Sequence, residues 1–129
     1  MLADGTTTLW QAVSPMTADA ILRDKGRVLH PSCQGDAFAL LKLNPELARQ
    51  MAETVWAQRY GAAAVVEIIV ASSALASYPM ESVAYEYHRE FRIPTSSLPL
   101  LSGALVRPAR VVQQLSPRAG VGDHWALAG

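Results

Sequence analysis

The chain has 129 residues, half of them hydrophobic, which suits one folded domain with one core and argues against disorder. Eleven basic residues balance eleven acidic ones, so the charge excludes a general electrostatic grip on nucleic acid or on an anionic membrane. A single cysteine, Cys33, excludes a disulfide framework within the chain.

The first part of the chain predicts a strand and then a helix. Residues 6–13 are rich in β-branched and aromatic side chains, which is typical of a strand. Ser14 and Pro15 supply an N-cap and a proline at the first helical position, and Gly26 ends the helix. Residues 27–30 predict a short strand after it.

The remainder predicts one more helix and several strands. The helix begins at Asn44 and Pro45, and its apolar residues recur at helical spacing to about residue 59. Five of the seven residues in 65–71 are β-branched, which favours a buried central strand. The other predicted elements are a strand over 83–93, a short turn or helix over 96–101, and a Pro-interrupted last strand over 104–114.

This order, a strand and two helices followed by several strands, predicts an α+β fold. We expect residues 1–114 to form a single domain and residues 115–129 a loosely packed tail anchored by Trp125. The N-terminus lacks the basic and apolar regions of a signal peptide. The most apolar stretch, 62–76, is shorter than the roughly 18–20 residues that a membrane helix needs. We therefore expect no membrane span and a cytoplasmic location, unless a larger polypeptide delivers the domain.

Four segments, in this order, resemble the small bacterial ADP-ribosyltransferase domains of toxins and effectors. They read TLWQAVSPMTADAILRDKGRV, GDAFALLKLNPELARQMAE, VVEIIVASSAL and HREFRIPTSSLPLL, and the resemblance spans roughly residues 8–113. The resemblance implies two short early helices packed on a mixed, mainly antiparallel split sheet. It also implies that NAD binds between two sheets and that ADP-ribose passes to an acceptor, such as a protein. A cognate immunity protein is a further expected partner.

Glu90 resembles the family's catalytic glutamate, because it stands directly before the sequence FRIP. The reaction passes through a cationic, oxocarbenium-like transition state, which a carboxylate stabilises. On a strand, Glu86, His88 and Glu90 share one face. His88 occupies the slot where arginine-modifying members carry Glu or Gln, so we consider it a candidate base or acceptor-binding residue.

The first two catalytic positions depart from the family pattern. Gln11 stands where many members have Arg or His, and it can hydrogen-bond a ribose without carrying charge. The second position falls near Phe38, which has no hydroxyl but could stack on nicotinamide. The expected NAD-binding residues are Gln11, Trp10, Phe38 and Arg27. The catalytic candidates are Glu90, His88 and Gln11.

Simpler readings stand beside these assignments. Phe38 and Trp10 also fit core packing, Arg27 fits a solvated helix end, and Glu67 fits a structural ion pair inside an apolar strand. The alternative function is a catalytically inactive fold of the same type that binds a protein through apolar surface such as residues 98–101. A weaker third hypothesis, a helical regulator, requires residues 65–71 to be helical.

Overall fold

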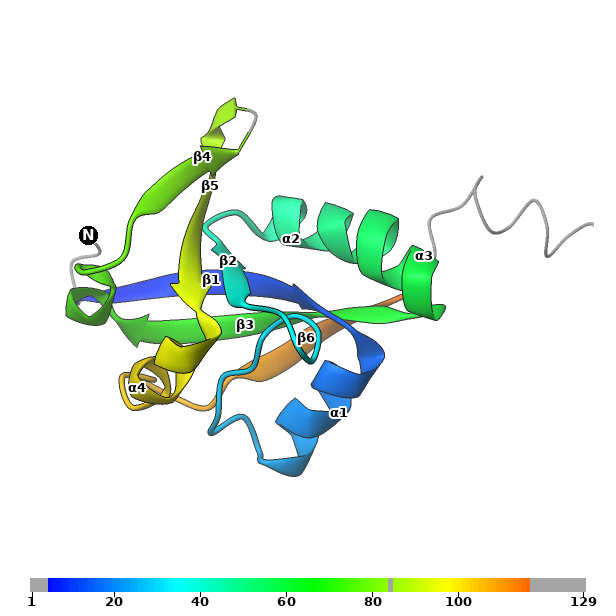
Figure 1. Cartoon of the computed structure of the whole chain (residues 1–129), viewed down its shortest axis with the longest axis horizontal. Helices are drawn as coiled ribbons and strands as arrows, with labels where there is room; N and C mark the ends of the chain where they lie inside the picture. The colour runs from blue at the N-terminus through cyan, green and yellow to red at the C-terminus, as the bar shows by residue number, and fades with distance from the viewer. Residues whose placement is uncertain (1–4, 84, 117–129) are drawn as a thin grey trace, which may run out of the picture.

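Six strands form one sheet in the order β4-β5-β2-β1-β3-β6, and the chain is α+β, as expected (Figure 1). The computed structural model describes residues 5–83 and 85–116, without the side chains of residues 81–88. The strands are β1 Thr6–Val13, β2 Phe38–Lys42, β3 Ala63–Ala71, β4 Met80–Val83, β5 Tyr85–Pro94 and β6 Arg110–Leu115. Every strand pair described is antiparallel and all six strands belong to one sheet, so the expected mixed, split sheet is not found.

The start of the chain folds as its sequence predicts. β1 covers the expected residues, and α1 (Pro15–Arg23) follows with Ser14 as its N-cap. The Ser14 hydroxyl accepts a hydrogen bond from the Thr17 amide, which satisfies one of the free donors at the helix start. Gly26 has a φ of 72°, a left-handed conformation that suits glycine just beyond a helix.

The second helical segment also begins and ends where the sequence indicates. It consists of α2 (Pro45–Met51), a π-helical turn (Ala52–Trp56) and α3 (Ala57–Tyr60). The Asn44 side chain caps its start, and Gly61, with a φ of 81°, ends it.

The sheet separates two hydrophobic clusters. Figure 1 shows α1 and α4 (Leu98–Ser102) on one side of the sheet and α2 with α3 on the other. Side chains alternate between these sides along each strand, so in β1 Leu9 and Val13 join the α1 cluster while Ala12 joins the α2 cluster. A site on one side of the sheet is therefore separated from the side chains on the other side by the full thickness of the sheet.

Four expectations differ from the structure. Residues 27–30 form no strand, because the Leu29 amide donates to the Ser102 side chain instead of to a strand partner. The strand expected over 83–93 is found as β5, but β4, which pairs with it in a hairpin, was not expected. The helices are not confined to the early chain, because α4 lies near its end. β3 is a strand, which contradicts the helical regulator.

Two further features concern the last strand and membrane spanning. β6 begins only at Arg110, beyond Pro108, and forms one edge of the sheet. Among the described residues, no helix is long and apolar enough to cross a membrane.

Candidate functional site

Glu90 lies inside the protein, paired with a lysine. β2 and β5 place Lys42 directly opposite Glu90, and the Lys42 ammonium donates to the Glu90 carboxylate. The two side chains are 1% and 8% exposed. Two buried charges of opposite sign neutralise each other, and each would be costly to bury without the other. The carboxylate is thus already committed to a partner within the core.

Gln11 lies on the other side of the sheet. The register pairs Trp10 with Lys42 and Lys42 with Glu90, and cross-strand partners share a face, so Trp10 lies on the Glu90 side. Gln11, the next residue in β1, therefore faces away from Glu90. Its buried side-chain amide donates to the His30 carbonyl oxygen at 2.8 Å, which holds the loop after α1. The two expected catalytic residues are not brought together.

Two of the expected NAD-binding residues do share a face with Glu90. Trp10 is half-buried there, packed against the α2 cluster. Phe38 lies four residues before Lys42 in β2, which places it roughly 13 Å away along the strand. The Arg92 guanidinium lies 4.8 Å from the centre of the Phe38 ring, a cation–π contact at the surface. Phe38 is thus exposed and is not a core residue.

The other two candidates stand apart from this group. Arg27 is exposed in the loop after α1 and lines a hollow of about 270 Å³ with Ser102 and Pro108. The backbone of His88 belongs to β5, but its side chain lies outside the described residues. The position of the His88 ring therefore stays a prediction.

Glu67 forms the structural ion pair that the sequence suggested. Its carboxylate accepts hydrogen bonds from Arg107 and Arg110, each at 2.9 Å. Partial burial by itself would raise the pKa of Glu67, but the hydrogen bonds and charges of the two arginines outweigh that effect and lower the pKa. Glu67 joins β3 to β6 and the loop before it, and so has a structural role.

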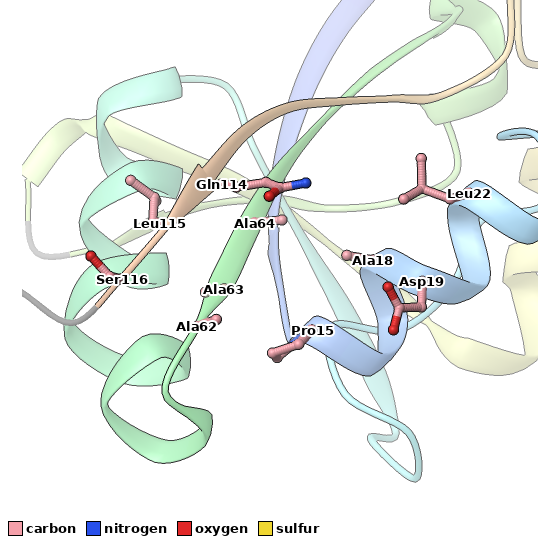
Figure 2. A pocket seen from close by; sticks show the side chains of 10 residues that line it. All are labelled: Pro15, Ala18, Asp19, Leu22, Ala62, Ala63, Ala64, Gln114, Leu115 and Ser116. Atoms are coloured by element: carbon pink, nitrogen blue, oxygen red, sulfur yellow. The ribbon is translucent and has the colours of Figure 1, made fainter.

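Three of the five hollows that we describe lie around α1. One of about 400 Å³ lies between α1, the start of β3 and the end of β6 (Figure 2). Figure 2 shows Gln114 pointing across it toward α1, while Leu115 points to the other side of β6. Leu22 stands at its α1 wall and is 58% exposed. Glu90 lines none of the five hollows that we describe.

A second, mostly apolar hollow of about 270 Å³ lies at the start of α1. Met16, which is 65% exposed, lines it together with Cys33 and Tyr60. The Cys33 sulfur and the Tyr60 hydroxyl are 3.2 Å apart, and this hydrogen bond raises the pKa of Tyr60. Tyr60 in turn stacks on Trp56, which anchors the wall of this hollow in the α2 cluster.

Lys42 is the residue that sequence reasoning missed. It ends the apolar segment FALLK, and a lysine in such a strand needs an acidic partner if it is buried. The same reasoning identified the structural role of Glu67, so the signal was present. The partner could not be named from sequence, because Lys42 and Glu90 are 48 residues apart.

Comparisons with protein families, curated proteins and solved structures found no match for this chain.

Proposed function

We propose that this chain is a catalytically inactive ADP-ribosyltransferase-like domain that binds a protein partner through the surface around α1. The observation that carries the proposal is the burial of Glu90 against Lys42. A transferase needs a free negative oxygen beside the sugar where positive charge develops. A carboxylate that a buried ammonium already neutralises does not supply one.

The order of elements supports the fold assignment. A first strand, a helix, an aromatic strand and a second helix precede the interior strand β3, in the order that the resemblance requires. β5 carries Glu90 directly before the sequence FRIP, next to β2 in the sheet. The residues of the expected active site are arranged differently, because the Gln11 side chain hydrogen-bonds the loop after α1 on the opposite side of the sheet from Glu90.

The surface around α1 supports the binding role. Met16 and Leu22 expose most of their apolar side chains, and each stands beside a hollow able to receive a partner's side chain. The sequence had pointed instead to residues 98–101. Leu98 and Leu101 are buried in the core, and only Leu100 is strongly exposed, at 79%. The α1 surface is thus the broader apolar region.

The enzymatic half of the proposal is tested by titrating NAD into the protein. Trp10 lies on the Glu90 side of the sheet, so its fluorescence should respond to a dinucleotide bound there. We expect no saturable change in fluorescence and no release of nicotinamide over hours. Nicotinamide release that stops in Glu90→Gln, with the fold intact by circular dichroism, would overturn the proposal.

The binding half is tested with matched surface variants used as bait. Leu22→Asp places a charge beside the hollow of Figure 2, whereas Leu100→Asp places one on the exposed residue of α4. We expect a protein retained by the native domain to be lost by Leu22→Asp and kept by Leu100→Asp. Equal retention by all three baits would contradict a binding surface at α1.

A second candidate function is NAD-dependent ADP-ribosyl transfer to a protein acceptor, by a toxin or effector domain within a larger polypeptide. It is favoured by the location of Trp10, Phe38 and Glu90 on one side of the sheet. For transfer, NAD binding would have to separate Glu90 from Lys42. The two candidates differ in one measurement, since only a transferase releases nicotinamide from NAD.

A further inference from the structure

A histidine that pairs with an aspartate lines the largest of the three hollows that we describe around α1. The Asp24 carboxylate lies 2.7 Å from Nε2 of His30. The hollow measures about 450 Å³ and lies between α1 and the loop that follows it. Its lining includes Met16, Ala20, Arg23, His30, Gln34 and Thr95. This volume is within the range of small-molecule sites, roughly 300–1,000 Å³.

The loop that carries His30 is held in place from several directions. The His30 carbonyl oxygen accepts from the buried Gln11 side chain at 2.8 Å. The neighbouring Leu29 amide donates to the Ser102 hydroxyl at 2.9 Å. The Ser32 carbonyl oxygen accepts from the Ser14 amide at 2.9 Å. A side chain on such a fixed backbone is pre-organised for a ligand, because little order remains to be imposed on binding.

Asp24 is poorly placed for the stability of α1. It caps the C-terminal end of the helix, where the dipole disfavours a negative charge. One of its oxygens, Oδ1, is buried and has no hydrogen-bond partner among the described residues. Local costs of this kind gather at functional sites. The gain from Asp24 is the orientation of His30, whose Nδ1 makes no hydrogen bond within the described part of the chain.

Arg23 adds a free cation to the same hollow. Its guanidinium is exposed and forms no hydrogen bond or ion pair with the residues that the structure describes. A guanidinium matches the planar or forked oxygens of a carboxylate or a phosphate with two parallel hydrogen bonds. Met16 and Ala20 supply apolar contacts beside it.

From this geometry we infer that the hollow is a binding site for a small organic anion. The anionic group, a carboxylate or a phosphate, pairs with Arg23. A neighbouring hydroxyl or amide of the ligand hydrogen-bonds Nδ1 of His30, and Asp24 holds the imidazole in orientation. The site lies across the sheet from Glu90, so it does not require NAD turnover, and it shares Met16 with the surface proposed above for a protein partner.

The test is a titration of the full chain with two probes, glycerol 3-phosphate and lactate, followed by NMR shifts of the Met16 methyl and the His30 ring. Each probe carries an anionic group beside a hydroxyl, and their relative affinities identify the phosphate or the carboxylate as the preferred group. We expect saturable binding of one probe. We expect Arg23→Gln to weaken it at least about tenfold, because one charge-assisted hydrogen-bonding group is lost.

Arg27→Gln is the matched control, because Arg27 is also exposed, follows the same helix and lines a different hollow. We expect it to leave the affinity unchanged. Asp24→Asn should weaken binding less than Arg23→Gln, since it keeps the shape of the pair. Failure of both probes to saturate, or an equal loss in Arg23→Gln and Arg27→Gln, would overturn the inference.

Discussion

Two pairs, each of one acidic and one basic side chain, lie on opposite sides of the sheet and differ in burial. The side chains of Lys42 and Glu90 are 1% and 8% exposed, in the interior of paired strands. Those of His30 and Asp24 are 27% and 28% exposed, and His30 lines a hollow. The first pair is closed to a ligand and the second is open to one.

The comparison shows that a carboxylate in the expected sequence context can be buried in an ion pair instead of facing a hollow. Glu90 stands where the resemblance requires it, yet it is buried and paired with the Lys42 ammonium. Asp24 carries no such signal in the sequence, yet its pair with His30 leaves a buried oxygen and a ring nitrogen unsatisfied among the described residues. Unused hydrogen-bonding capacity beside a hollow, at Nδ1 of His30, is the feature on which the proposed binding site rests.

The largest loss of stability is expected from removing Glu90, one member of the buried Lys42–Glu90 pair. Glu90→Leu leaves the Lys42 ammonium buried without a counter-charge, which should lower the free energy of unfolding by about 3–5 kcal/mol. Urea denaturation followed by tryptophan fluorescence measures this change. Glu46→Gln removes a carboxylate from an exposed pair with Arg49 and should leave the urea midpoint unchanged. A similar loss of stability in Glu90→Leu and Glu46→Gln would contradict the difference expected between a buried and an exposed ion pair.

A second substitution disturbs the open pair through its backbone. A methyl group on Gly26 would lie 2.1 Å from the Ala109 carbonyl oxygen, at a φ of 72°. Gly26→Ala should therefore cost about 2–3 kcal/mol of stability and displace the loop that carries Asp24 and His30. Gly61→Ala has a similar φ of 81° but open space around it, so about 1 kcal/mol is expected. Equal losses would show that the contact with Ala109 is unimportant.

A smaller, pH-dependent effect is expected at Glu67, which is paired but lies near the surface. Arg107 and Arg110 lower the pKa of its carboxyl below the ordinary value of 4.5, so its stabilising effect is present above that value and lost as the pH falls through the lowered pKa. Glu67→Gln should thus be about 1 kcal/mol less stable than the native chain at pH 7 and equally stable at pH 2–3. Thermal unfolding at several pH values measures the difference. A difference in stability between Glu67→Gln and the native chain that persists at pH 2–3 would indicate a packing effect instead.

The sequence predicted the parts of the fold that depend on local chemistry. The bounds of β1 and the starts of α1 and α2 follow from β-branched residues and from the Ser14 and Asn44 caps. These signals act over a few residues, so no knowledge of distant partners is needed.

The parts that failed depend on distant contacts. The division of residues 80–94 into a hairpin, and the pairing of Lys42 with Glu90, follow from the register between strands. The separation of Gln11 from Glu90 follows from the same register, because shifting a strand by one residue exchanges its two faces. The pairing of Asp24 with His30 depends on how the loop after α1 is tied to Gln11 and Ser102.

The central claim, that Glu90 stabilises the core with Lys42, is tested most directly by removing both charges. We predict that Lys42→Met/Glu90→Leu recovers most of the stability lost in Glu90→Leu and lies within about 1–2 kcal/mol of the native chain in urea, because neither charge then remains buried alone. A double variant as unstable as the sum of the two single variants would contradict the account, and so would a Glu90→Leu chain that unfolds at the native urea concentration.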